Sequence, residues 1–586
     1  MKKQEKHADP GAYFTLGGRK RLLLFVLGWI AVMSVLAGRL VYIMVVKAEH
    51  YSGLALNVQE RERSIKAARG IIYDRNNVVI ADNKPVCSIS VIHNQIKDPE
   101  SVISELSTRL GIEESEVRKR VEKVSSREKI KSNVDREIGE QIRDLELDGV
   151  MVDEDFKRYY PYSSLASKVI GFTGADNQGI VGLEVQYDSV LMGQSGSINT
   201  LTDSRGIELE NAVERRIEPV AGNNLVTSLD VNIQKYIEQT AYNLMKKKNA
   251  KRVCIIVMNP QNGEIYGLAD VPEYDLNSPF TLNRELDEGE ELTQDVLNRM
   301  WRGFCTNDTY EPGSVFKIIT ATSAFEEGKV RVEDGFYCPG YRIVDDRRIK
   351  CHKVVGHGAE TFKQGIMNSC NPVFMEIGER VGKTAFYKNM RKLGLFEKTG
   401  VDLPGEANSI FHKLENVGPV ELATMSFGQS FQITPLQLLR AVAAVVNGGT
   451  LVTPHFGVYV TDNNNNIIEK LDYDKKSGVI STETSETMKE LLEAVVSEGT
   501  GKNAYVEGYS IGGKTATSEK LPRGNGKYIS SFLGFAPADN PQIMTLLLID
   551  EPEGVYYGGT IAAPAVGNIY ENILPYMGIE KTEKVE

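Results

Sequence analysis

Hydrophobic residues form one long, nearly continuous run close to the start of the chain. The run extends from Leu22 to Gly38, is interrupted by Arg39, and resumes as far as Val46. A helix crosses a bilayer with roughly 20 apolar residues. The pattern therefore predicts a transmembrane helix over residues 22–46. We expect Arg39 to extend toward the outer surface or to face a partner helix, because an unpaired charge in lipid is costly.

Basic residues before this run predict its orientation. By the positive-inside rule they keep a tail of residues 1–21 in the cytoplasm and place the rest of the chain outside. A cleaved signal peptide is the alternative, but the run is longer than a signal core and no small-x-small site follows it cleanly. We therefore expect a single-pass anchor in the cell membrane. The basic residues are Lys2, Lys3, Lys6, Arg19, Lys20 and Arg21.

The next part of the chain, residues 50–224, alternates short β-like runs with charged stretches. The runs at 70–81 and 86–93 have the alternation of strands, whereas 99–143 is rich in Glu, Lys and Arg at helical spacing. The simplest interpretation of 99–143 is a helical face exposed to solvent. We prefer this to the alternative, a docking surface for other proteins. We expect an elongated pedestal domain with strands and helices.

A second folded domain is predicted over residues 225–575, followed by a tail at 576–586. Residues 233–248 have a helical pattern, and Asn262-Gly263 between two apolar runs is a strong hairpin signal. The first and last apolar runs are expected to share one antiparallel sheet flanked by helices, so the chain is predicted to be a multidomain α+β protein. The runs typical of strands are 253–259, 264–269, 508–517, 530–536 and 543–549.

Length and charge agree with this division. The chain has 586 residues, which is too many for one ordinary core. Its net charge of −11, with no basic face interleaved with aromatic residues, argues against nucleic acid as a partner.

Three short motifs carry the candidate chemistry. They are Ser314-Val-Phe-Lys317, Ser369-Cys-Asn371 and Lys514-Thr-Ala-Thr517, and the second and third begin 55 and 200 residues after Ser314. Residues three apart meet on a helix surface, so the first motif places an amine beside a hydroxyl. Such an amine can activate the serine if burial lowers its pKa. Each motif alone occurs often by chance, but their order and spacing together predict a serine that attacks an acyl group.

This motif set resembles that of the penicilloyl-serine transferases, and its flanks resemble those of class B penicillin-binding proteins. The resemblance extends from Arg21 onward and is weakest at about 100–150. It implies a membrane-anchored D,D-transpeptidase of the division or sporulation type. The matching segments are Tyr310-Glu-Pro-Gly-Ser314, Phe427-Gly-Gln429, Thr434-Pro-Leu-Gln437, Asn447-Gly-Gly449, Arg69-Gly-Ile-Ile-Tyr-Asp-Arg75, Gly179-Ile-Val-Gly-Leu-Glu184 and Tyr187-Asp188.

The resemblance also implies a role for each motif residue. Ser314 is the expected nucleophile and Lys317 the expected base. Ser369 would relay a proton, and Asn371 would bind the substrate amide. The third motif would hold the carboxylate of a terminal D-alanine through Lys514, Thr515 and Thr517, with the N–H groups of Ser314 and Thr517 as oxyanion hole.

The implied partners follow from that reaction. They are peptidoglycan stem peptides ending in D-Ala-D-Ala, β-lactams, the membrane, and a polytopic glycosyltransferase with other wall-synthesis proteins. The chemistry requires no cofactor. Residue 516 departs from the family's usual Lys-Thr-Gly, because it is alanine, and we expect its methyl to crowd this edge and to alter β-lactam affinity more than transpeptidation.

Six cysteines pose a separate question in a domain expected outside the membrane. Cys338 and Cys351 bracket a predicted hairpin with its turn near Asp345-Asp346. The simplest interpretation is that they form a disulfide or remain two buried thiols. His352 and His357 follow closely, so a structural zinc site is the alternative. Further candidate ligands, which flank the catalytic motifs, are Cys305, Asp308 and Cys370.

Other functions stay open at this stage. The same chemistry serves D,D-carboxypeptidases, β-lactamases and β-lactam sensors, but the large pedestal disfavours the first two and a sensor needs more transmembrane segments. A catalytically silent scaffold of the division or sporulation machinery is disfavoured by the intact motifs. The sequence does not distinguish elongation, division and sporulation.

Overall fold

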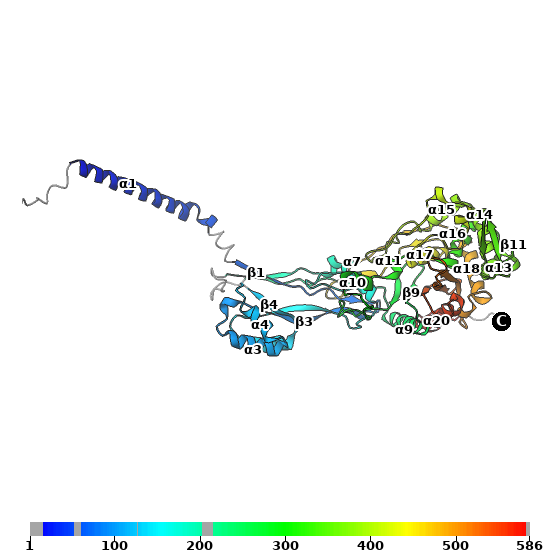
Figure 1. The fold of residues 1–586 in the computed structure, drawn as a ribbon, viewed down its shortest axis with the longest axis horizontal. Helices are drawn as coiled ribbons and strands as arrows, with labels where there is room; N and C mark the ends of the chain where they lie inside the picture. Colours follow the sequence, from blue (N-terminus) through cyan, green and yellow to red (C-terminus); the bar gives the residue numbers. More distant parts are fainter. Residues whose placement is uncertain (1–15, 52–59, 126, 202–214, 582–586) are drawn as a thin grey trace, which may run out of the picture. The chain divides into compact units, whose positions relative to one another are not determined.

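A computed structural model describes residues 16–51, 60–125, 127–201 and 215–581 (Figure 1). The first described element is the helix α1 (Leu16–Val41), which continues as the π-helical turn η1 (Tyr42–Val46). Within Lys20–Val46 the mean hydropathy of an 18-residue stretch reaches 2.1, and by length and composition this is the one helix of the described residues that could cross a membrane. Most of the predicted tails, 1–15 and 582–586, lie outside the described residues.

The remaining chain divides into two compact units that interleave in sequence. The first contains residues 86–155 and 195–219 together with the N-terminal segment that ends at Ile65, and the second contains 66–85, 156–194 and 220–586. Two long strands, β3 (Val79–Val91) and β5 (Val150–Tyr159), contribute to both. The second unit thus includes segments from the region predicted as pedestal together with the whole region predicted as the second domain.

The first unit has its own core, in which three helices pack against the end of β3 that belongs to this unit. The helices are α3 (Pro99–Leu110), α4 (Glu114–Val121) and α5 (Arg136–Arg143). Asp98 caps α3 and Gly111 ends it in the left-handed conformation, as expected for these residue types. A three-stranded antiparallel sheet of β1 (Glu60–Ile65), β6 (Gly196–Leu201) and β7 (Arg215–Ile217) also belongs to this unit.

The helical interpretation of 99–143 is wrong for part of that stretch. Residues Glu128–Asp135 form the strand β4, which pairs antiparallel with β3. Only Ile130 and Val134 are buried on it. With only two apolar positions among charged residues, the alternation typical of a strand was too weak to distinguish from a helical pattern. The strand conformation of this segment is determined by its pairing with β3.

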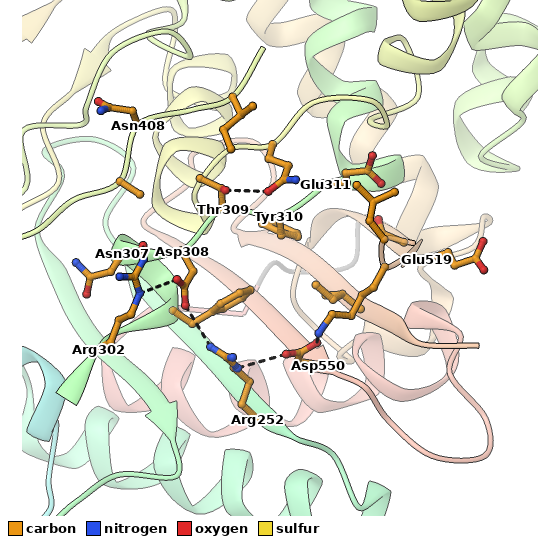
Figure 2. Close-up of a pocket in the computed structure, with 18 residues that line it drawn as sticks. Arg252, Arg302, Asn307, Asp308, Thr309, Tyr310, Glu311, Asn408, Glu519 and Asp550 are labelled. Atoms are coloured by element: carbon orange, nitrogen blue, oxygen red, sulfur yellow. Dashed lines mark hydrogen bonds and ion pairs between the residues drawn. The ribbon is translucent and has the colours of Figure 1, made fainter. Parts of the chain in front are cut away.

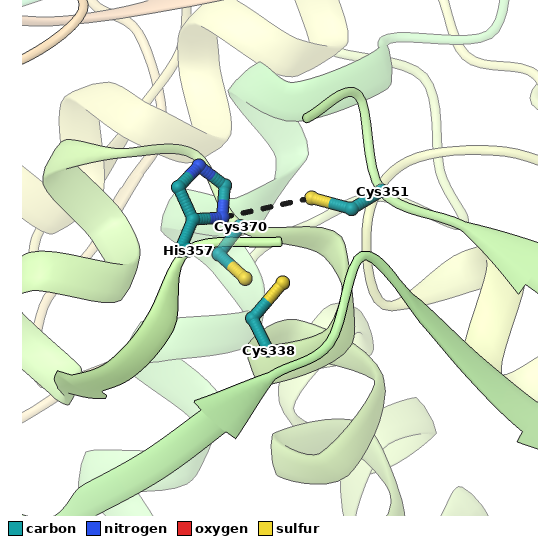
Figure 3. Close-up of side chains that lie close together, drawn as sticks. All are labelled: Cys338, Cys351, His357 and Cys370. Carbon is teal, nitrogen blue, oxygen red and sulfur yellow. Dashed lines mark hydrogen bonds between the residues drawn. The ribbon is translucent and has the colours of Figure 1, made fainter. Parts of the chain in front are cut away.

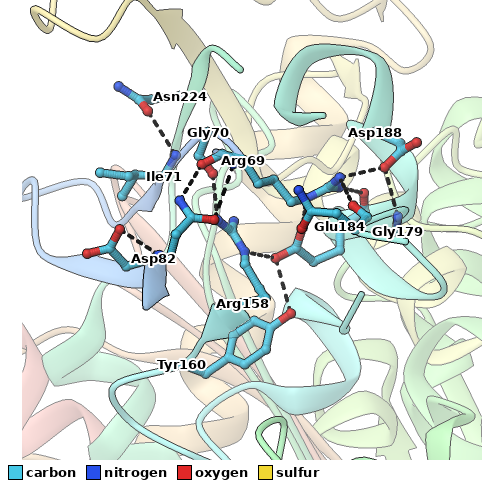
Figure 4. A network of polar contacts seen from close by, with 12 residues as sticks. Arg69, Gly70, Ile71, Asp82, Arg158, Tyr160, Gly179, Glu184, Asp188 and Asn224 are labelled. Carbon is cyan, nitrogen blue, oxygen red and sulfur yellow. Dashed lines mark hydrogen bonds and ion pairs between the residues drawn. The ribbon is translucent and has the colours of Figure 1, made fainter. Parts of the chain in front are cut away.

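Within the second unit, buried charges join segments far apart in the sequence (Figure 4). Arg69 Nε lies 2.6 Å from Glu184 Oε2, and Arg69 Nη1 lies 2.7 Å from Asp188 Oδ1. The other oxygen of Glu184 accepts from Arg158 Nε at 2.7 Å and from the Tyr160 hydroxyl at 3.2 Å. The side chains of Arg69 and Glu184 are fully buried. This network explains why residues near 69 and 184 fold with the larger unit.

A five-stranded antiparallel sheet forms the centre of this unit, in the order β10-β9-β21-β20-β19. Both faces of the sheet are covered, which is why its strands are continuous apolar runs. On β9, Val253, Ile255 and Val257 belong to one core, and Cys254, Ile256 and Met258 belong to the other. The strands are β9 (Arg252–Met258), β10 (Ile265–Val271), β19 (Gly512–Glu519), β20 (Tyr528–Ala536) and β21 (Ile543–Asp550).

Helices cover the two faces. The helices α9 (Val231–Lys248) and α20 (Ala563–Tyr576) pack together against one face (Figure 1). The opposite core contains α12 (Lys317–Glu326), α14 (Asn371–Val381), α17 (Pro435–Val446) and α18 (Thr482–Ser497). The predicted mixed α+β architecture is confirmed, and β19 is left as the sheet edge that faces the catalytic motifs.

Candidate active site

The first motif lies on a tight turn that leads into α12. Residues Gly313–Phe316 form the 3₁₀ turn η3, in which side chains three apart stand one above the other. Gly313 has a φ of 57°, and a Cβ there would lie 2.1 Å from Ser518 Oγ on β19. Only glycine allows the turn to approach the strand this closely. The neighbouring Ser314 is consequently held, half-buried, at the edge of the sheet.

Lys317 is fully buried, and within the described part of the chain its ammonium group hydrogen-bonds to neutral groups alone. Its Nζ donates to Ser369 O at 2.6 Å, to Ser369 Oγ at 3.2 Å and to Asn371 Oδ1 at 2.7 Å. Burial lowers the pKa of Lys317 to about 8, although Cys370, Cys351 and Glu360 act in the opposite direction. An amine with this pKa can accept a proton near neutral pH.

The second motif holds its two functional side chains around Lys317. Ser369 has a φ of 54°, a left-handed conformation that is uncommon for residues other than glycine. Asn371 begins α14, and its amide nitrogen donates to Lys350 O at 3.3 Å. The first and second motifs therefore form one hydrogen-bonded cluster, although 52 residues separate Lys317 from Ser369.

The third motif lies on β19. Lys514 is fully buried, and burial together with the nearby charge of Lys317 lowers its pKa well below the ordinary value. The Thr515 hydroxyl donates to Thr500 Oγ1 at 3.2 Å, and Thr517 Oγ1 accepts from Gly558 N at 3.0 Å. The methyl group of Ala516 is buried and faces the position where a Gly313 side chain would lie, at 3.5 Å. It thus packs under the catalytic turn.

A cluster of sulfur and imidazole groups adjoins the second motif (Figure 3). One ligand atom from each of Cys338, Cys351, His357 and Cys370 lies within 4.8 Å of the others. Cys351 Sγ lies 3.8 Å from Nδ1 of His357 and also 3.8 Å from Nδ1 of His352. His352 is exposed and lies outside the set of four. Of the four residues predicted as the zinc site, the structure brings Cys338, Cys351 and His357 together, and the fourth member is Cys370, one of the further candidates.

The hairpin predicted between Cys338 and Cys351 is present as β12 (Tyr341–Val344) and β13 (Arg347–Lys350). All six cysteines are free thiols, and Cys338 and Cys351 form no disulfide. A second group of Cys254, Asp270 and Cys305 is buried elsewhere in the unit, without Asp308. There Asp270 already pairs with Lys168 at 3.4 Å and accepts from the Cys254 thiol at 3.3 Å.

Sequence reasoning missed the residues that position the motifs. Gly428 has a φ of 88°, and a Cβ there would lie 2.0 Å from Gly313 O. Glu311 pairs with Arg523 and accepts from Ser430 N at 2.8 Å. Both residues belong to segments that carry the family resemblance. Their contacts, however, form between segments far apart in the chain, so no local sequence pattern predicts them.

Comparison with known proteins gives consistent matches over most of the chain. The family model "Penicillin binding protein transpeptidase domain" matches residues 253–571, and "Penicillin-binding Protein dimerisation domain" matches residues 64–227. Stage V sporulation protein D of Bacillus subtilis is 39% identical over 96% of this chain and 86% of its own length. A probable peptidoglycan D,D-transpeptidase, PenA of Neisseria meningitidis, is 29% identical over 100% of this chain and 96% of its own.

Solved structures share the fold. Penicillin-binding protein 2X of Streptococcus thermophilus has a TM-score of 0.73 at 20% identity, covering 90% of this chain and 83% of its own. Penicillin-binding protein 3 of Mycobacterium tuberculosis, complexed with aztreonam, has a TM-score of 0.67 at 24% identity, covering 89% and 98%.

Proposed function

This chain belongs to the penicillin-binding proteins and is a membrane-anchored peptidoglycan D,D-transpeptidase, and we propose that Ser314 is the nucleophile through which it acts. The observation that carries this assignment is the cluster around Lys317. A buried amine with a pKa of about 8, one turn after the serine, is the base that a serine nucleophile needs. The alternatives of a carboxypeptidase, a β-lactamase, a sensor or a silent scaffold are not favoured by the named relatives.

The proposed acylation step uses the geometry around that base. Lys317 accepts the proton of the Ser314 hydroxyl, and the oxygen attacks the carbonyl of the penultimate D-alanine. The N–H groups of Ser314 and Thr517 stabilise the oxyanion, and losing one such donor costs about 2.7–4 kcal/mol of barrier. Ser369, which is hydrogen-bonded to Lys317 Nζ, passes the proton to the leaving D-alanine amine. A new ester bond joins Ser314 to the peptide.

The second step releases the enzyme. A primary amine of a neighbouring stem peptide attacks the ester, an amide bond forms, and the proton returns to Ser314. Asn371 binds the substrate amide, and the Lys514, Thr515 and Thr517 side chains bind the terminal carboxylate. Thr517 Oγ1 accepts from Gly558 N, so its hydroxyl proton is left to donate to that carboxylate, whereas the Thr515 hydroxyl, which donates to Thr500 Oγ1, would turn toward the carboxylate on binding.

A fluorescent penicillin tests the nucleophile. We expect the full chain to form a slowly released covalent adduct that is absent from Ser314→Ala. Ser323→Ala is the matched control, because Ser323 is a buried serine on α12, the helix that follows the catalytic turn, and its hydroxyl donates to Ile319 O at 2.8 Å. Labelling that persists in Ser314→Ala refutes the assignment, and rapid release of the label would indicate β-lactam hydrolysis.

We extend the proposal to location and partners. The N-terminus lies in the cytoplasm, and the two folded regions, proposed as a pedestal over 50–224 and a transpeptidase domain over 225–575, lie outside. Stem peptides ending in D-Ala-D-Ala are the substrate, and a polytopic glycosyltransferase supplies the glycan strands. The similarity to a protein named for sporulation favours a role there. Depletion tests this role: defective spores with normal vegetative cells support it, and filaments or round cells refute it.

We also propose a structural zinc ion next to the second motif. Three thiolates and one imidazole are a common tetrahedral set, in which sulfur ligands lie about 3.8 Å apart, given a Zn–S bond of about 2.3 Å. The spacing within Cys338, Cys351, His357 and Cys370 is compatible with this. The ion would fix the hairpin against Cys370, which lies between Ser369 and Asn371.

Metal analysis of the tag-free protein tests the zinc proposal. We expect about one zinc per chain, lost in Cys351→Ser and retained in Cys87→Ser, since Cys87 is a buried thiol far from the cluster in sequence. A metal-free wild-type protein whose Cys338 and Cys351 react as ordinary thiols refutes it.

A further inference from the structure

Two cavities of the larger unit differ in how their charges are paired. In the cavity beside the catalytic turn, Arg302 and Arg252 both pair with Asp308, at 2.7 Å and 3.4 Å (Figure 2). The other cavity, of about 630 Å³, lies between the helix α15 (Lys383–Lys392) and the segment 409–415. We call it the α15 groove. Its volume is that of a ligand site, and the reaction described above makes no use of it.

Basic side chains line the α15 groove with little opposing charge. The helix α15 carries four basic residues and no acidic one, in a chain whose net charge is −11. The lining contains Lys388, Arg391 and Lys413 against one carboxylate, that of Glu415. Lys388 pairs with Glu327 at 3.5 Å, but among the described residues no carboxylate pairs with Arg391 or Lys413. Two exposed cations are therefore free to bind an anion.

Helix stability accounts for only part of this charge. Cations in the last turn of a helix interact favourably with its dipole, which is reason enough for Arg391 and Lys392. Lys413 lies outside α15, on the other segment that lines the groove, and has no such role. Because cations from two separate segments converge on one concavity, the charge indicates a ligand and not a helix end alone.

Aromatic rings line the same groove. The ring centroids of Phe396 and Phe411 lie 4.5 Å apart, and that of Tyr387 lies 5.3 Å from Phe396. Both phenylalanines are half-buried, so part of each ring is left at the surface. The Arg391 guanidinium lies 5.5 Å from the centroid of the Phe396 ring. The negative face of an aromatic ring attracts the C–H groups of a sugar ring. The groove thus offers ring faces and cations side by side.

The aromatic rings continue from the groove to the catalytic turn. Phe411 stacks on Phe431 with a centroid distance of 4.8 Å, and Phe431 lies 4.5 Å from Phe316. Phe316 is two residues from Ser314 in the turn that carries the proposed nucleophile. The groove and the catalytic turn therefore share one core, and a polymer bound in the groove is held close to the nucleophile.

We propose that the α15 groove binds an uncross-linked peptidoglycan strand, outside the catalytic site. Sugar rings of the strand stack on Phe396 and Phe411. Free carboxylates of its stem peptides pair with Arg391 and Lys413. Peptidoglycan is the material on which the family acts, and it combines both chemistries, whereas a polyol phosphate has the charge without a ring face. The groove keeps the enzyme on one strand between successive cross-links.

Binding of soluble glycan strands to the full chain in detergent tests the groove. The stem peptides are trimmed of both D-alanines, so they lack the group that the catalytic site recognises. Half of the strands have their carboxylates converted to amides. We expect wild type to bind the acidic strands more tightly, and the difference to shrink as salt is added. Arg391→Gln and Lys413→Gln should each lower the affinity for acidic strands about three- to fivefold, with no change for amidated ones.

Two further variants separate the contributions of charge and ring. Lys247→Gln is the matched control, because Lys247 is an exposed lysine on α9, which packs on the opposite face of the central sheet. It should leave both affinities unchanged. Phe396→Leu keeps an apolar side chain but removes the ring, so it should weaken acidic and amidated strands equally. Thermal unfolding followed by circular dichroism shows that each variant is folded at the temperature of the binding measurement.

Three results overturn the proposal. The first is equal affinity of wild type for acidic and amidated strands, and the second is the same loss in Lys247→Gln as in Arg391→Gln. The third is a polyglycerol phosphate of matched charge that binds as tightly as the acidic strands, because the ring faces then contribute nothing. No acylation enters these measurements. A failure of penicillin to label Ser314 therefore refutes the nucleophile and not the groove.

Discussion

Arg69 and Lys317 are buried to the same extent, with exposures of 1% and 0%, but the charges around them differ. Arg69 lies between the carboxylates of Glu184 and Asp188. Burial opposes its charge, yet the paired carboxylates more than offset this and raise the pKa of the guanidinium. Lys317 has only neutral oxygen partners, and burial lowers its pKa to about 8.

The difference separates a structural use of a buried cation from a chemical one. A charge with paired carboxylates is fixed in one protonation state and joins distant segments. A charge without them is destabilised, and this makes the amine able to exchange its proton during a reaction. Removal of each side chain should therefore affect different properties of the protein.

The largest expected effect is on activity, at Lys317. Substitution Lys317→Met keeps the volume but removes the base, so penicillin acylation should slow by about 10²- to 10⁴-fold. Stability should change by less than about 1 kcal/mol, because the cost of burying an unpaired charge disappears together with its hydrogen bonds. Stopped-flow acylation and denaturant unfolding measure the two. Acylation at near wild-type rate would remove Lys317 from the mechanism.

The opposite outcome is expected at Arg69. Arg69→Met leaves Glu184 buried with an incomplete set of partners, and breaking such a pair costs about 3–5 kcal/mol. Unfolding followed through Trp301, which is buried in the same unit, should show this loss. Arg299→Met is the control, since Arg299 pairs with Glu290 at 3.0 Å on the surface and should cost about 0.2–1 kcal/mol. Equal losses in both variants would contradict a structural role of the network.

A pH profile sharpens the contrast further. The pKa of Lys317 is about 8, so below this pH the amine carries a proton and cannot accept another. The rate of penicillin acylation should therefore fall by about tenfold per pH unit below 8 and level off above it. A rate that is constant between pH 6 and 9 would show that Lys317 does not act as the base in this range.

The features that could be predicted from sequence are those with a local signal. The strands around Lys514 and the hairpin at Tyr341–Lys350 have clear apolar runs and turns, and both are present. The stretch at Glu128–Asp135 was misread because only two of its residues are buried. Cys370 could be named from sequence only as a further candidate beside Cys305 and Asp308, because the choice among them depends on segments far apart in the chain. The approach of Gly313 to Ser518 depends on such segments too, so no local pattern could show it.

The smallest expected effect is at Ala516, where the sequence departs from the family pattern. Its methyl group faces Gly313 and is buried, so it supports the catalytic turn from below as well as occupying the strand edge. Ala516→Gly should cost about 0.5–1 kcal/mol of stability. It should also change acylation rates by a few-fold, differently for different β-lactams, because the turn that carries Ser314 gains freedom. If Ala516→Gly and wild type are acylated at the same rate by each of several β-lactams, the position of this turn is set by Gly313 and Gly428 alone, without the methyl group.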